Sequence, residues 1–137
     1  MPSDAPSSMS VAEWLRHARS DLAVASQAVA PDILFETLCF HAQQAVEKSI
    51  KAVLLQKGVV FPYTHDIARL ITLVNTAGIP WQEALNPSAD LTEYAVETRY
   101  PRETNSVTET EYRQAIEIAE RVVAWAESII EGEPRRS

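Results

Sequence analysis

The chain has 137 residues, of which 46% are hydrophobic and 23% charged, and these values fit one globular domain with a proper core. No apolar run approaches the roughly 20 residues that a membrane-spanning helix needs, so no membrane segment is expected. The formal net charge is −7, and residues 83–137 hold 12 of the acids against 6 bases. Duplex DNA binding through a broad basic surface is therefore not expected, and any nucleic-acid contact must be local.

The ends of the chain read as tails around one domain. Residues 1–9 lack the basic and apolar regions of a secretory signal, so we expect a disordered N-terminal tail, a helical bundle over 10–131 and a frayed tail over 132–137. The single cysteine, Cys39, falls on an apolar helical face and is expected to be a buried hydrophobe rather than a reactive thiol. A cytoplasmic location fits this cysteine content.

Helical signals begin early in the chain. Ser10 and Glu13 form a capping box, which predicts a first helix over 10–29 that ends before Pro31. A second helix is predicted over 33–57, closed by Gly58. After a short connection in which Thr64 is placed to cap, a third helix is expected over 65–77.

The second half continues the same pattern. Asn86 and Pro87 predict the start of a helix over 87–98, and a polar loop follows. Thr108 and Glu111 make a second capping box, which opens a helix over 109–131. No segment alternates with period two, so no strand is predicted. The fold class is all-α: an antiparallel up-and-down bundle of four main helices plus one short helix.

The second predicted helix carries both a core face and a polar stripe. His41, Gln44, Lys48 and Lys51 share one side of this helix, next to its broad apolar face. The stripe is either a solvated surface or part of a binding site. We expect Asp21 of the first helix to pair with the Lys48 stripe.

Several common site types are excluded by the residues present. The three glycines each stand at a helix end, so no phosphate-binding glycine loop is available. The three histidines lie on different segments and the chain has no cysteine pair, so no metal site is expected. No Glu-x-x-His pair for a di-iron centre occurs. The sequence predicts no cofactor.

The remaining candidate is a nucleotide or phosphate site around Arg99 and Tyr100. A guanidinium beside an aromatic ring at a proline turn offers a fork for phosphate and a surface for a base. Candidate site residues contribute from three places in the chain: Arg99, Tyr100 and Arg102, together with His41, Lys48 and His65. The alternative is that Arg99 pairs with Asp66 or Glu97 and that His65 bonds a backbone carbonyl.

Three segments together resemble the HEPN domain family: FHAQQAVEKSIKAVL, FPYTHDIARL and LTEYAVETRYP, followed by an amphipathic helix. The similarity extends over roughly residues 10–130, and its distinctive parts are the Gln-Gln-x-x-Glu-Lys helix, the Thr-His-Asp helix start and the Arg-Tyr-Pro turn. The resemblance implies an all-α bundle that forms a homodimer. It also implies a nucleotidyltransferase-fold partner protein in a two-gene toxin-antitoxin module.

Many members of that family are metal-independent ribonucleases with an arginine followed, after four to six residues, by a histidine. Arg99 occupies the arginine position, whereas Thr104, Asn105 and Ser106 stand where the histidine is expected. Imidazole is the usual proton carrier near neutral pH, and these three side chains do not replace it. The ribonuclease motif is therefore incomplete, with Arg99 as its one matching residue.

Three hypotheses follow. The first is a non-catalytic module that binds a nucleotide or RNA near Arg99 and docks a partner. The second is a ribonuclease that uses His41 or His65 with Arg99. The third is a purely structural adaptor. As candidates for the dimer face, we consider three aromatic residues that we expect to be exposed: Trp81, Tyr100 and Trp125.

Overall fold

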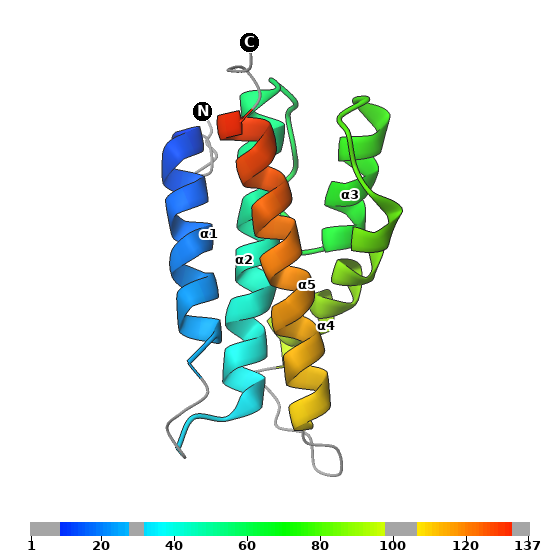
Figure 1. The fold of residues 1–137 in the computed structure, drawn as a ribbon. Helices are drawn as coiled ribbons and strands as arrows, with labels where there is room; N and C mark the ends of the chain where they lie inside the picture. Colours follow the sequence, from blue (N-terminus) through cyan, green and yellow to red (C-terminus); the bar gives the residue numbers. More distant parts are fainter. Residues whose placement is uncertain (1–8, 28–31, 98–106, 133–137) are drawn as a thin grey trace.

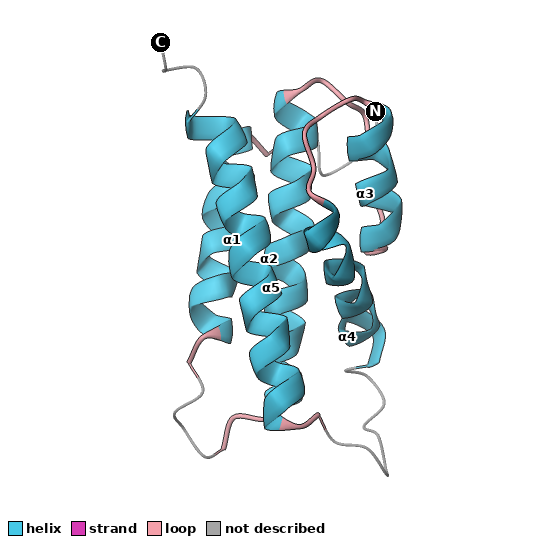
Figure 2. Cartoon of the chain, turned by 45° about the vertical axis from the view of Figure 1, so that its right-hand side comes forward, coloured by secondary structure: helices cyan, strands magenta, loops and turns pink. Residues whose placement is uncertain are grey.

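The computed structural model describes residues 9–27, 32–97 and 107–132, and all its regular elements are helical (Figure 1). The elements are the α-helices α1 (Val11–Ala25), α2 (Phe35–Gln56), α3 (Ile67–Thr76), α4 (Thr92–Glu97) and α5 (Glu109–Glu127), with a 3₁₀ helix, η2 (Glu83–Leu91), and a π-helical turn, η3 (Ser128–Gly132). Within these residues no strand is found (Figure 2). The predicted all-α fold class is confirmed.

Helix α2 is the centre of the bundle. It packs against α1, α3, α4 and α5, and the ribbon shows α1 and α5 flanking it along its length while α3 stands to one side (Figure 1). The apolar face predicted for this helix is fully buried at Val46, Ile50 and Val53. Cys39 on the same face is also fully buried, as predicted. No helix in the described residues is long and apolar enough to cross a membrane.

The helix ends follow the local sequence signals closely. Both predicted capping boxes are present: the Ser10 hydroxyl accepts from the Glu13 amide at 3.0 Å, and the Thr108 hydroxyl accepts from the Glu111 amide at 3.1 Å. Gly58 adopts φ 73° after α2, the left-handed conformation that favours glycine at this position. Capping residues therefore set where α1 and α5 start and where α2 stops.

The connection between α2 and α3, residues 58–66, runs back beside α2. The Val59 amide donates to the Leu54 carbonyl at 2.9 Å, and further along the connection the His65 ring reaches Glu47 in the middle of α2. Helix α3 consequently starts beside the middle of α2. The cap of α3 is Asp66, whose carboxylate accepts from the Ala68 amide, so the helix begins at residue 67 and the predicted capping role of Thr64 is wrong.

The segment 83–97 differs from the predicted helix over 87–98. It forms a 3₁₀ helix first and becomes α-helical only from Thr92. Pro87 lies inside the 3₁₀ stretch, where its missing N–H and its ring disfavour regular α-helical bonding. Asn86 does not act as the expected cap, because its side-chain oxygen accepts from the Trp81 indole at 2.8 Å.

The aromatic residues considered for a dimer face do not all lie on the surface. Trp125 is buried, packs edge-on against Trp81 and donates its indole N–H to the Pro80 carbonyl at 2.7 Å. Its predicted exposure is therefore wrong, and Trp81 is half-buried. Tyr100 lies outside the described residues, as do most of the predicted tails 1–9 and 132–137, which stay predictions.

Candidate functional site

The first polar cluster joins α1 to α2 and consists of Asp21, His41 and Lys48. One oxygen of the Asp21 carboxylate lies 2.9 Å from His41 Nδ1, and the other accepts from Lys48 Nζ at 2.7 Å. The predicted pairing of Asp21 with the Lys48 stripe is confirmed. The side chains of His41 and Lys48 remain 29% and 22% exposed, so this α1–α2 cluster is open to solvent on one side.

The geometry of the α1–α2 cluster fixes what it presents to solvent. A carboxylate only accepts hydrogen bonds, so His41 Nδ1 is the N–H donor to Asp21, and a neutral ring then has Nε2 as an acceptor. Lys48 has three N–H donors, of which Asp21 takes one. An oriented imidazole and a cation thus stand side by side at the surface.

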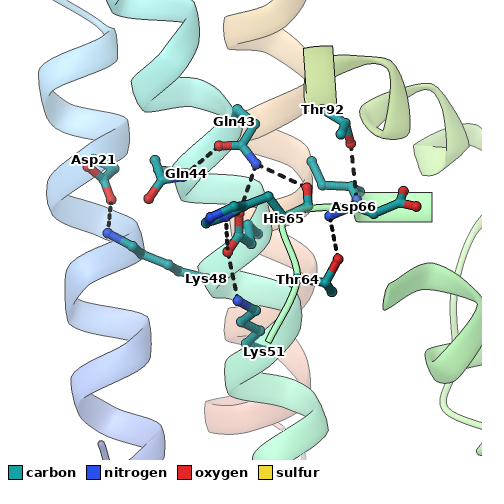
Figure 3. A network of polar contacts seen from close by, with 11 residues as sticks. Asp21, Gln43, Gln44, Lys48, Lys51, Thr64, His65, Asp66 and Thr92 are labelled. Carbon is teal, nitrogen blue, oxygen red and sulfur yellow. Dashed lines mark hydrogen bonds and ion pairs between the residues drawn. The ribbon is translucent and has the colours of Figure 1, made fainter. Parts of the chain in front are cut away.

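The second cluster lies on the neighbouring side of α2 and centres on Glu47. Figure 3 labels its other members, Gln43, Lys51 and His65. Lys51 Nζ and Gln43 Nε2 donate to the Glu47 carboxylate at 2.7 and 2.8 Å, and His65 Nδ1 lies 3.0 Å from it. Gln44 extends the cluster by donating to the Gln43 carbonyl oxygen at 2.6 Å. We call Gln43, Glu47, Lys51 and His65 the Glu47 cluster.

Most of the Glu47 cluster is withdrawn from water. The side chains of Glu47 and Lys51 are 4% and 2% exposed, whereas His65 is 50% exposed. A buried ion pair is tolerated when its remaining donors and acceptors are satisfied, and here Gln43 and His65 supply two further bonds to the carboxylate. The ammonium also lies within 6 Å of three aromatic rings: Trp14, Phe61 and Tyr63.

Two predictions about these residues need correction. The sequence places Lys51 on the polar stripe with His41 and Lys48, but the residue is buried because Glu47, four residues earlier, receives its charge inside the bundle. The sequence also places His65 at the first helical position, where a bond to a backbone carbonyl is the alternative to a role in the site. It instead precedes the Asp66 cap, and its ring bonds the Glu47 carboxylate.

The predicted site residues therefore fall into three groups. His41 and Lys48 are brought together by Asp21, and His65 belongs to the separate Glu47 cluster. Arg99, Tyr100 and Arg102 lie outside the described residues, as do Thr104, Asn105 and Ser106. The predicted convergence of the three groups on one site stays a prediction.

Sequence reasoning missed the buried members of the Glu47 cluster. Glu47 and Lys51 stand at i and i+4, a spacing at which opposite charges on a helix are neighbours. That spacing was the available signal, and it did not reveal the burial, which depends on the later connection packing over the helix. The polar atoms of Gln43 likewise gave no sign that this residue would be fully buried.

No metal site is formed by the part of the chain that the structure describes, where no three His, Cys, Asp or Glu side chains gather suitably. The only cysteine is chemically quiet, because burial raises the pKa of the Cys39 thiol to about 12. Burial also raises the pKa of the nearby Tyr94 hydroxyl. The reactive groups of the two clusters are thus imidazole, ammonium and carboxylate groups.

Comparisons with known proteins concern the sequence and the fold. The sequence model of the HEPN domain matches residues 11–129. The fold is similar to the crystal structure of TT1696 from Thermus thermophilus, with 27% identity, a TM-score of 0.71 and coverage of 88% of this chain and 98% of that one. It is also similar to ST0689, an archaeal HEPN homologue, with 24% identity, a TM-score of 0.68 and coverage of 88% and 97%. A search of curated proteins gave no significant match. The chain belongs to the HEPN domain family.

Proposed function

We propose that this protein is a nucleotide- or RNA-binding and partner-binding HEPN module. In this proposal it acts as a cytoplasmic homodimer in a two-gene, toxin-antitoxin-like system with a nucleotidyltransferase-fold partner. The observation that carries the binding part is the α1–α2 cluster, in which Asp21 holds His41 and Lys48 side by side at a partly exposed position. The Lys48 ammonium gives one of its three N–H groups to Asp21 and keeps the others as donors to a phosphate.

The charge distribution limits the kind of ligand. With a net charge of −7, the protein lacks the basic surplus that holds a duplex by its phosphates. In the α1–α2 cluster Asp21 offsets one positive charge, so the cluster suits a single phosphate group better than a long polyanion. The proposed site also includes Arg99, Tyr100 and Arg102, which would add a second point of contact.

Ligand-induced stabilisation tests the binding part. A nucleotide that binds only the native state increases the free energy of unfolding, by about 2.7 kcal/mol when its concentration is one hundred times Kd. The melting temperature rises as a result. We expect a set of nucleoside mono-, di- and triphosphates to give such a shift, which Arg99→Ala and Lys48→Gln reduce. Lys57→Gln is the matched control, because Lys57 is an exposed lysine at the end of the same helix. Unchanged melting curves with every nucleotide would contradict the binding part.

The partner and dimer parts rest on family membership alone. We expect co-expression with a nucleotidyltransferase-fold protein encoded beside this one to give a stable complex on size-exclusion chromatography. The isolated chain is expected to elute as a dimer in light-scattering measurements. A monomer at high micromolar concentration, or no complex with that partner, would count against these parts without affecting nucleotide binding.

A second candidate function, a metal-independent ribonuclease, is favoured by one observation. Both His41 and His65 are held through Nδ1 by a carboxylate, which leaves Nε2 of each neutral ring free to take a proton. The two rings are not arranged as a pair, however. His41 and Glu47 are six residues apart on α2, about 9 Å along its axis and on different sides.

RNA cleavage in the presence of a chelator tests this second candidate. If the ribonuclease hypothesis is correct, Arg99→Ala and either His41→Gln or His65→Gln abolish cleavage, whereas His17→Gln does not, because His17 is an exposed histidine outside both clusters. Absence of cleavage by the unmodified protein at high dimer concentration would exclude the hypothesis and leave the binding proposal in place.

A further inference from the structure

Tyr63 occupies an unusual position in the connection between α2 and α3. The connection runs back beside α2, so that Tyr63 comes over Lys51 and His65 comes over Glu47 (Figure 3 shows the His65 end). The Lys51 ammonium lies 5.7 Å from the centroid of the Tyr63 ring. Yet Lys51 is only 2% exposed, whereas Tyr63 is 76% exposed. One face of the ring covers a buried cation, and the rest of the ring faces solvent.

The position of Tyr63 over Lys51 leaves the outer face of its ring available to a ligand that stacks. The Lys51 ammonium is itself held by Glu47 and by the rings of Trp14 and Phe61, and its attraction to the face of Tyr63 favours one orientation of that ring. An aromatic side chain that is fixed before binding loses little conformational entropy when it stacks. The outer face of Tyr63 is therefore an ordered aromatic surface.

The neighbours of Tyr63 are polar rather than apolar. The His65 ring meets it edge-on at 5.8 Å and is itself half-exposed. Val60 is the other large hydrophobic residue exposed in this connection. The remaining large exposed hydrophobic residues of the described part are Val24, near the C-terminal end of α1, and Ile33 and Leu34, just before α2. A protein-docking surface would normally show a wider continuous apolar patch. A lone ring with a polar edge suits a single flat ligand.

We propose that Tyr63 and His65 form a stacking site for an unpaired nucleobase of single-stranded nucleic acid. This inference rests on the proposed function, because the phosphate next to that base is taken up by the α1–α2 cluster. Lys51, which lies under Tyr63, and Lys48 are three residues apart on α2, about 4.5 Å along the helix axis. Tyr63, which lies over Lys51, is thus about one helical turn along α2 from the phosphate-binding cation Lys48.

The local charges indicate that stacking, and not electrostatic attraction, supplies most of the affinity. Two ammonium groups, Lys48 and Lys51, are paired with two carboxylates, Asp21 and Glu47. If one phosphate is bound, the logarithm of the association constant falls with the logarithm of salt concentration with a slope of about −0.7. Duplexes are expected to bind poorly, because their bases are already stacked and paired.

Fluorescence anisotropy with a labelled ten-nucleotide RNA tests the inference. The same sequence as single-stranded DNA and as an RNA duplex completes the set of ligands. We expect Tyr63→Leu to raise Kd for the single strands by between about fivefold and a hundredfold, the usual effect of losing one stacking partner. Tyr63→Phe keeps the ring, and Val60→Ala changes an exposed neighbour in the same connection, so both should bind like the unmodified protein. Circular dichroism melts check that each variant folds.

A second measurement does not depend on the variants. In the unmodified protein, the ring protons of Tyr63 should shift upfield in the NMR spectrum when the single-stranded RNA is added, because a stacked base lies above them. Unchanged resonances at saturating RNA would overturn the inference even if Tyr63→Leu failed to fold.

The outcomes separate this inference from the proposed function. If Tyr63→Leu binds RNA normally while Lys48→Gln does not, the stacking site is wrong and the proposed function stands. If the unmodified protein binds none of the nucleic acids or nucleotides, both are wrong. Duplex bound as tightly as single strands, or a Tyr63→Leu defect seen only with a partner protein, overturns the stacking site in favour of a different surface role.

Discussion

Removing the positive charge of the Glu47 cluster should destabilise the protein strongly. In Lys51→Met the aliphatic stem is kept, but the Glu47 carboxylate, 4% exposed, loses its ion-pair partner at 2.7 Å. Breaking a buried pair by removing one partner typically costs about 3–5 kcal/mol, because the other charge stays buried without compensation. Gln43 and His65 still bond Glu47, so we expect the lower end, about 3 kcal/mol.

A loss of this size is easy to measure in a domain of 137 residues. Total stabilities of about 5–15 kcal/mol mean that 3 kcal/mol is a large fraction of the whole. With a urea m-value of about 2 kcal/mol/M, the unfolding midpoint falls by about 1.5 M. The melting temperature falls by roughly 10 °C, judged from domains of similar size.

Urea unfolding followed by far-UV circular dichroism is the assay, and the chain offers a matched control. Arg113 and Glu109 form an ion pair of the same i, i+4 spacing on α5, but their side chains are 73% and 60% exposed. Arg113→Met should leave the midpoint nearly unchanged, because water screens the pair. If Lys51→Met is as stable as Arg113→Met, the ion pair does not have the energetic role assigned to it.

A double-mutant cycle separates the pair from its surroundings. Glu47→Gln alone leaves the Lys51 ammonium buried without a carboxylate, whereas Glu47→Gln with Lys51→Met removes both charges. We expect the double variant to be more stable than the sum of the single losses predicts, by roughly 1–3 kcal/mol. Simple additivity of the two losses would show that the two side chains act independently.

Three further predictions concern the core and the helix ends. Burial raises the pKa of the Cys39 thiol from 9.0 to about 12, so the thiol of the unfolded state loses its proton first and the stability of the protein falls as pH rises through that interval. In urea melts at a series of pH values, Cys39→Ala should lose less stability over this interval than the unmodified protein. An equal loss would contradict the assignment. Tyr112→Phe removes a buried hydroxyl that donates to the Ala25 carbonyl at 2.6 Å and should cost about 1 kcal/mol in the same assay, and an unchanged unfolding midpoint would contradict this. Thr108→Ala removes the capping box of α5 and should also cost about 1 kcal/mol, with no effect expected from Thr110→Ala, an exposed site within the helix.

The sequence was most informative where structure depends on neighbouring residues. The capping boxes at Ser10 and Thr108 and the left-handed Gly58 are local features, and all three are found as predicted. The buried stripe of α2 follows from helical periodicity, which a long amphipathic segment displays clearly. The segment around Pro87 was predicted less well, because a 3₁₀ helix uses the same start signals as an α-helix.

Features that depend on distant residues were only partly predictable. The pairing of Asp21 with Lys48 was predicted because the two residues carry opposite charges on consecutive helices, and the structure contains this pair. The contact of His65 with Glu47 spans 18 residues and follows from the path of the connection, which short-range patterns do not determine. The burial of Lys51 has the same origin. The predicted site around Arg99 lies outside the described residues, so that part of the sequence analysis remains a prediction.

The central helix links stability and binding through one carboxylate. Glu47 must be satisfied inside the bundle, and it receives bonds from Lys51 on its own helix and from His65 on the connection. The second bond holds the connection against α2, and the Lys51 ammonium in turn holds Tyr63 by its inner face. The exposed aromatic surface is therefore a consequence of how the buried charge is compensated. For this reason, substitutions at Glu47 or Lys51 should weaken single-strand binding as well as stability, whereas Tyr63→Leu should affect mainly binding.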